Sequence, residues 1–314
     1  PTNAVLEQRV AELEGGIGAL AMASGMAAIT ATIQTIARVG DNIVSVSQLY
    51  GGTYNFFAHT LPQQGIEVRM AAGEDPAAIE ALIDDNTKGI FCESIGNPAG
   101  NIVDLKALAD VAHKHGIPLI VDNTVATPVL CRPFDFGADI VVHALTKYMG
   151  GHGTTIAGII VDSGKFPWKD NPRFPQFNQP DPSYHGVVYA EALGPAAFIG
   201  RARVVPLRNM GAALSPFNAF LILQGIETLS LRMERHCENA QKVAEYLKGH
   251  SKVKWVNYAG LPGDRYHDLA GRYMNGKPSA ILSFGIEGGR DAGARFIDAL
   301  QMIKRLVNIG DAKS

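Results

Sequence analysis

Strand-like and helix-like segments alternate along the first two thirds of the chain, and this alternation constrains the fold more than any other feature. The strand-like runs are apolar without polar alternation, which is typical of strands covered on both faces. Helical periodicity separates these runs, so the pattern predicts an α/β fold with a mostly parallel sheet and helices on both faces. The expected strands are 43–46, 66–70, 89–93, 118–121, 140–143 and 156–161.

The helices expected between these strands have recognisable ends. Gly15-Gly16 ends the first helix, and Pro76 suits the first turn of a later one. A long helical pattern leads into a smaller α/β part, so we expect a large domain over 1–232 and the start of a small C-terminal domain over 233–314. The expected helices are 5–13, 26–39, 51–60, 76–83, 104–115, 219–248 and 292–303, and the expected later strands are 253–256 and 281–286.

The charge balance and the cysteines exclude several classes of function. The 28 Lys and Arg residues nearly match the 30 Asp and Glu residues, and no basic stripe indicates nucleic acid or an anionic membrane as a partner. No apolar run reaches the ~18 residues that a membrane span needs. Cys92, Cys131 and Cys237 form none of the close pairs that suggest metal or redox sites. These features predict a cytoplasmic protein without a metal site.

Residues 163–186 interrupt the alternating pattern. Prolines are frequent in this stretch, together with aromatic residues such as Trp168 and Phe174. The composition predicts a long ordered loop, which is either an excursion over the surface or a functional lid.

Candidate site residues follow the predicted strands, because ligands bind beyond the carboxyl ends of the strands in such sheets. Lys147 comes after the strand 140–143, where a lysine amine can form a Schiff base with a carbonyl group. Asp122 ends the strand 118–121 and could bind a metal, a ribose or a protonated pyridine nitrogen. Taken singly, such a lysine is more often a surface residue, and such an aspartate is as often a cap or turn residue.

Three further positions add to this pattern. Ser24, Gly25 and Met26 begin a helix, whose free amides and dipole favour a phosphate. Tyr50 follows a strand and could stack on a planar ring, and Asn97 follows another and could bond a ring hydroxyl. A helix cap, a buried tyrosine and a turn are the plain structural alternatives. One site that binds a phosphate, a ring nitrogen, a ring hydroxyl, a ring face and an aldehyde would use all of these positions.

Over essentially its whole length, the chain resembles the Cys/Met-metabolism family of pyridoxal-phosphate (PLP) enzymes. The stretches that carry the resemblance are 23–28, 48–53, 93–98, 121–124 and 143–153. The resemblance implies the aspartate-aminotransferase-like architecture called fold type I, with PLP as the cofactor.

The resemblance also implies a role for each candidate residue. Lys147 would hold PLP as a Schiff base, and Asp122 would pair with the pyridine nitrogen. Tyr50 would stack on the ring and assist proton transfer, and Asn97 would lie near the ring hydroxyl. The residues expected at the phosphate or beside the ring are Ser24, Gly25, Met26, Thr146 and Thr124.

Within the family the chain is most similar to the O-acetylhomoserine sulfhydrylases, on the stretches 93–101, 161–166 and 180–186. Those enzymes of methionine biosynthesis replace the acetoxy group of O-acetylhomoserine with sulfide and release homocysteine and acetate. The family resemblance implies a homotetramer built as a dimer of dimers. A methionine γ-lyase, a cystathionine γ-synthase and a non-catalytic relative of the same fold remain alternatives. The sequence also leaves open whether the leaving group is acetyl or succinyl, and whether the sulfur donor is free or carrier-bound sulfide.

Two departures from the family pattern bear on the cofactor. Ala144 stands where the family usually has a phosphate-binding serine, so we expect weaker retention of PLP by about 1.5–3 kcal/mol. The family's N-terminal arm would precede Pro1, and its arginine for the substrate carboxylate would follow Ser314. We therefore expect this chain to lack both groups.

Overall fold

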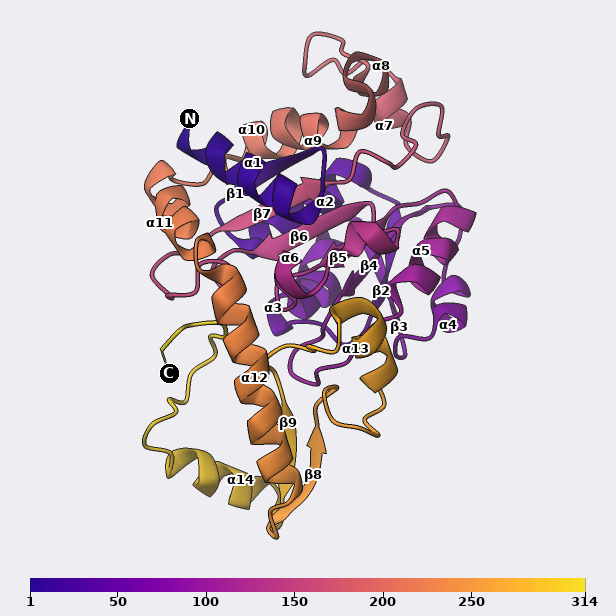
Figure 1. Ribbon diagram of the computed structural model, residues 1–314. Coiled ribbons are helices and arrows are strands. Elements are labelled where there is room, and N and C mark those ends of the chain that lie inside the picture. The colour runs from indigo at the N-terminus through magenta and orange to yellow at the C-terminus, as the bar shows by residue number, and fades with distance from the viewer. Residues whose placement is uncertain (314) are drawn as a thin grey trace.

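The computed structural model of the chain describes residues 1–313, and its main element is a seven-stranded sheet (Figure 1). The strand order is β1-β7-β6-β5-β4-β2-β3. The five strands from β3 to β6 are parallel neighbours, whereas β7 runs antiparallel between β6 and β1, so the mostly parallel sheet is confirmed. The strands are β1 Gly18–Met22, β2 Asn42–Val46, β3 Glu67–Ala71, β4 Thr87–Glu93, β5 Leu119–Asp122, β6 Ile140–Ala144 and β7 Gly158–Asp162.

Helices cover both faces of this sheet, because consecutive strand residues point to opposite faces. On β6, Ala144 lies against Gly25 at the start of α2, whereas His143 hydrogen-bonds Glu14 at the end of α1. The first two helices therefore pack on opposite faces. The helices are α1 Thr2–Glu14, α2 Gly25–Ile36, α3 Gly51–Asn55, α4 Pro76–Glu80, α5 Leu105–Lys114, α6 Thr127–Leu130, α7 Pro175–Asn178, α8 Tyr189–Leu193, α9 Ala197–Ala202, α10 Arg208–Met210, α11 Pro216–Ile226, α12 Leu229–Lys248, α13 His267–Met274 and α14 Gly289–Asp298.

Several segments differ from the sequence-based prediction, which did not include the short helices α6 to α10 or helix α13. Strand β1 was not predicted either, because its sequence Gly-Ala-Leu-Ala-Met has none of the β-branched side chains that mark strands. The single helix expected over 219–248 is two helices, α11 and α12. Between them the Gly225 carbonyl accepts the Thr228 amide at 3.4 Å in a tight turn, and it also accepts the Arg232 guanidinium at 2.6 Å.

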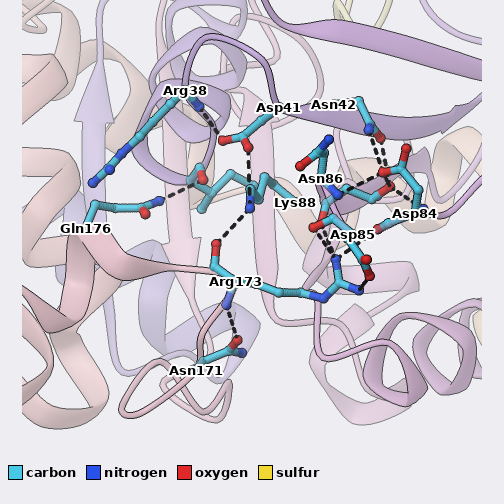
Figure 2. Close-up of polar contacts among 12 residues, drawn as sticks. Arg38, Asp41, Asn42, Asp84, Asp85, Asn86, Lys88, Asn171, Arg173 and Gln176 are labelled. Carbon is cyan, nitrogen blue, oxygen red and sulfur yellow. Dashed lines mark hydrogen bonds and ion pairs between the residues drawn. The ribbon is translucent and has the colours of Figure 1, made fainter.

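The loop 163–186 packs onto the amino edge of the sheet rather than lying loosely on the surface. Trp168 is only 2% exposed and stacks on Phe177, with 4.4 Å between the ring centroids. Arg173 donates three hydrogen bonds to carbonyl oxygens where β4 begins, and Lys88 donates to the Arg173 carbonyl at 2.9 Å (Figure 2). The loop therefore packs against the amino edge of the sheet, which is opposite to the carboxyl ends of the parallel strands.

The last part of the described chain forms a second, smaller sheet beside the long helix α12 (Figure 1). Its antiparallel strands are β8 Val253–Asn257 and β9 Ser283–Ile286. After α14 the chain returns to the large sheet, where the Ala312 amide bonds the Gly151 carbonyl at 2.8 Å. The domain boundary at residue 232 stays a prediction. Among the described residues, no helix has both the length and the apolar character that crossing a bilayer requires.

Candidate active site

A cavity of about 220 Å³ lies at the carboxyl edge of the parallel strands, and every residue predicted for the cofactor site lines it. The strand ends of β2, β4, β5 and β6 and the start of α2 supply these residues. The role of each residue toward a cofactor stays a prediction. The cavity is lined by Ser24, Gly25, Met26, Ile29, Tyr50, Glu93, Ile95, Asn97, Asp122, Thr124, Val125, Ala144, Thr146, Lys147, Ile156, Val307 and Ile309.

The start of α2 forms an anion site at one end of the cavity. The Ser24 hydroxyl caps the helix and accepts a hydrogen bond of 3.0 Å from the Ala27 amide. A Cβ atom on Gly25 would lie 2.6 Å from the Ala144 Cβ, so glycine alone allows this close approach to β6. Within residues 1–313, no acceptor binds the amides of Gly25 and Met26. These amides and the helix dipole favour a phosphate group.

Asp122 lies at the end of β5, where it is held by its neighbours. Its Oδ1 atom accepts the Thr124 amide at 2.9 Å, and the Thr124 hydroxyl accepts the Ala144 amide at 2.8 Å. Burial raises the pKa of the Asp122 carboxyl group. Two effects oppose that rise: the hydrogen bonds from Thr124 and the electrostatic influence of the nearby His143. In the described part of the chain no Lys or Arg side chain pairs with this carboxylate. It can therefore pair with a cation inside the cavity.

Tyr50 and Asn97 are connected through a residue that the sequence-based prediction did not include in the site. The Tyr50 ring packs over Gly52, where a Cβ atom would lie 2.6 Å from the tyrosine Cε1. Glu93, the last residue of β4, accepts a hydrogen bond of 2.5 Å from the Tyr50 amide and another from the Asn97 amide. The position of Glu93 at a strand end was the signal that could have identified it.

Lys147 follows β6, and its half-buried amine reaches the cavity. The Nζ atom donates a hydrogen bond of 2.5 Å to Oδ1 of Asn308. Burial lowers the pKa of the amine, and the carboxylate of Asp311 opposes that shift. The neighbouring Thr146 hydroxyl instead donates to the Ala157 carbonyl at 3.2 Å, so it would have to turn before it could bind a phosphate.

The remaining lining residues had no local sequence signal. Val307 and Ile309 lie in the coil after α14, on either side of Asn308 and more than a hundred residues from Lys147. Apolar residues that line a cavity do not differ in type from those of the core. The lining residues missed for this reason are Ile29, Ile95, Val125, Ile156, Val307 and Ile309.

The cavity fits a planar ring that carries a phosphate, a cationic nitrogen and an aldehyde. The free amides of Gly25 and Met26 match the phosphate, and the unpaired carboxylate of Asp122 matches the nitrogen. The Lys147 amine, whose pKa is lowered by burial, is more readily available in its neutral, nucleophilic form. These are the groups that PLP requires of a protein.

Comparisons with known proteins give the same result. The profile of the family described as Cys/Met metabolism PLP-dependent enzyme matches residues 1–314. A homocysteine synthase from Schizosaccharomyces pombe is 51% identical over 316 residues, which cover all of this chain and 74% of that protein. O-acetyl-L-homoserine sulfhydrylase 1 from Thermus thermophilus is 52% identical, and the match covers all of this chain and 75% of that protein.

Two solved structures are similar over the whole of this chain. A putative O-acetylhomoserine (thiol)-lyase from Campylobacter jejuni has a TM-score of 0.97 and 42% identity, with 78% of that chain covered. That structure contains N'-pyridoxyl-lysine-5'-monophosphate. An O-acetylhomoserine sulfhydrylase from the methionine biosynthetic pathway of Wolinella succinogenes has a TM-score of 0.89 and 41% identity, with 87% of that chain covered.

Proposed function

We propose, from the premise that this chain belongs to the family of Cys/Met metabolism PLP-dependent enzymes, that it converts O-acetylhomoserine and sulfide into homocysteine and acetate. The fold is the type I fold expected of such enzymes, and PLP is the cofactor of the family. One observation carries the proposal: Lys147, Asp122 and the free amides at the start of α2 meet in a single cavity.

The residues that would hold the cofactor follow from the cavity. The amides of Gly25 and Met26 would bind the phosphate, and Asp122 would bind the ring nitrogen. Asn97 would bind the ring hydroxyl, and Lys147 would bond to the aldehyde carbon. When bound, PLP supplies an electron sink for the charge that develops on the substrate carbons.

The side chains of the cavity then move protons on the substrate. The lowered pKa of Lys147 suits this amine to accept protons from the Cα and Cβ atoms of O-acetylhomoserine. Acetate leaves Cγ with the electrons of the C–O bond, and sulfide forms the new C–S bond at the same carbon. Lys147 then returns the protons to Cβ and Cα. Tyr50 is 45% exposed at the mouth of the cavity, where its phenol can exchange protons with the leaving group.

The proposal is tested by the products of the PLP-loaded enzyme. O-acetylhomoserine with sulfide should give homocysteine and acetate in equal amounts, and O-succinylhomoserine should react more slowly. Release of α-ketobutyrate from methionine, without homocysteine synthesis, would assign a γ-lyase instead. Protein without visible absorption after incubation with PLP would point to a non-catalytic relative.

We also propose that the protein assembles as a homotetramer built from dimers. We further propose that it is located in the cytoplasm. Helix α11 exposes Phe217 and Phe220 by 67% and 48%, and such an apolar surface supports contact with a second subunit. Cys92, Cys131 and Cys237 are buried free thiols, which supports a reducing compartment. Light scattering should give the mass of four chains, and cell fractionation should recover the enzyme with cytoplasmic markers. A monomer, or enzyme in another fraction, would contradict these points.

A further inference from the structure

Glu93 is a buried acid in the cavity that the proposed mechanism does not use. It is 5% exposed and ends β4, where it is the register partner of Asp122 at the end of β5. Side chains of register partners in parallel strands point to the same face of the sheet. The two carboxyl groups therefore lie side by side at the edge of the cavity.

The contacts of Glu93 connect the residues assigned to the ring. Its Oε1 atom accepts the Tyr50 amide at 2.5 Å, and its carboxyl group also accepts the Asn97 amide. Tyr50 lies in the segment after β2, whereas Asn97 lies in the turn after β4. One side chain thus joins the residue assigned to the ring face, the residue assigned to the ring hydroxyl and the strand end beside the ring nitrogen.

The charge around Glu93 explains how two acids coexist at this edge. Burial, with the Asp122 carboxylate as the second cause, raises the pKa of Glu93 to about 8. The other titratable groups near it are the Tyr50 phenol after β2, the Cys92 thiol on β4 and the Lys147 amine after β6. At neutral pH Glu93 is therefore protonated, and its carbonyl oxygen still accepts amide hydrogen bonds.

We propose that Glu93 is a positioning residue, which fixes Tyr50 and Asn97 relative to Asp122 so that all three meet one planar ring. The inference rests on the proposed function, because it assumes that the ring is PLP. It assigns Glu93 no contact with the reacting atoms. Glu93 acts here in its uncharged acid form, through its carbonyl oxygen. Glutamine has the same carbonyl oxygen and no charge, so Glu93→Gln should keep part of this positioning role.

Three variants of the intact protein test this inference. Glu93→Ala removes the acceptor of both amides, and Glu93→Gln keeps it. Asp162→Ala is the matched control, because Asp162 is also a buried acid that accepts two backbone amides, those of Gly164 and Ile199. It lies at the amino end of the sheet, opposite the cavity.

The readouts are the PLP dissociation constant of the apoprotein, the circular dichroism of bound PLP, kcat, and the melting temperature. Glu93→Ala should raise the dissociation constant and lower kcat by at least about tenfold each. Glu93→Gln should change both by no more than about threefold. The wild type should lose cofactor dichroism as the pH rises through about 8, because ionised Glu93 repels the carboxylate of Asp122, and Glu93→Gln should not show this loss. Asp162→Ala should lower the melting temperature alone.

Equal behaviour of Glu93→Ala and Asp162→Ala would show that Glu93 is only structural and would overturn the inference. A Glu93→Gln variant as impaired as Glu93→Ala, or one that keeps the alkaline step, would also overturn it. If Glu93→Ala does not fold, the pH profile of Glu93→Gln decides alone. The cofactor measurements need no substrate, so a wild type that binds PLP but makes no homocysteine would refute the proposed function and leave this inference standing.

Discussion

The amine of Lys147 donates a hydrogen bond of 2.5 Å to the side-chain carbonyl oxygen of Asn308. Asn308 in turn donates to Asp311 at 3.1 Å, so the coil after α14 holds the lysine through two polar side chains. Burial lowers the pKa of Lys147, and Asp311 is the charge that opposes this shift. The coil after α14 therefore influences the pKa of the Lys147 amine, although Lys147 itself follows a strand of the large sheet.

Replacing Asn308 by Asp should raise the pKa of Lys147, because a carboxylate beside the ammonium favours the charged form. The neutral amine would then form only at higher pH. The rate at which the apoprotein regains visible absorption on adding PLP should be measured as a function of pH. The midpoint of that pH profile should shift up by about 1 pH unit. Asn308→Ala is the control without a new charge, and an unchanged midpoint in Asn308→Asp would contradict the prediction.

Replacing Lys147 by Ala should lower kcat by at least about 10³-fold, because no other Lys or Arg among the described residues lines the cavity. The far-ultraviolet circular dichroism should match the wild type, since the amine contacts the coil rather than the core. Borohydride treatment of the wild type should label this lysine and no other residue. Full activity in the variant would refute the assignment of the site.

Replacing Asp122 by Asn should weaken PLP binding by about 10- to 100-fold, because a charge-assisted hydrogen bond to the ring nitrogen is lost. The Thr124 amide can still bond the asparagine oxygen, so the local backbone should stay in place. Exchange of the substrate Cα proton for deuterium should also become slower. Unchanged absorption spectra and exchange rates would rule out the role of Asp122.

Replacing Ala144 by Ser should tighten PLP binding by about tenfold, because the Ala144 Cβ faces Gly25 at the start of α2 and an added hydroxyl can bond the phosphate. Equilibrium titration of the apoprotein measures this change. Ala144→Val is the control, since its bulk adds no donor and crowds the helix start. A serine variant that binds PLP no better than the wild type would show that the missing family serine is compensated elsewhere.

Replacing Arg173 by Ala should lower the free energy of unfolding by about 1.5–3 kcal/mol, because the guanidinium bonds three carbonyl groups at the amino edge of the sheet. Its values of kcat and KM should not change at low temperature. Arg235, which is 67% exposed and pairs with Glu238, is the matched control and should change stability by at most about 1 kcal/mol when replaced by Ala. Lost activity without lost stability would show that the loop 163–186 acts as a lid.

Local sequence patterns were enough to predict the strands of the parallel sheet and most of the polar residues that line the cavity. Ser24, Tyr50, Asn97, Asp122 and Lys147 were all predicted because each follows a strand or begins a helix. The carboxyl ends of parallel strands meet at one edge of the sheet, so positions along the chain translate directly into neighbours in space. Capping residues and strand ends are local features, so they can be recognised in a single sequence.

Tertiary structure alone decided which distant groups meet. Lys147 and Asn308 are 161 positions apart, and the buried pair Glu14 and His143 is 129 positions apart. The pKa of Glu93 is raised by its burial and by Asp122, which the strand register places beside it. Charge, burial and long-range contacts arise only when separate segments pack together, and no local pattern in the chain specifies that packing.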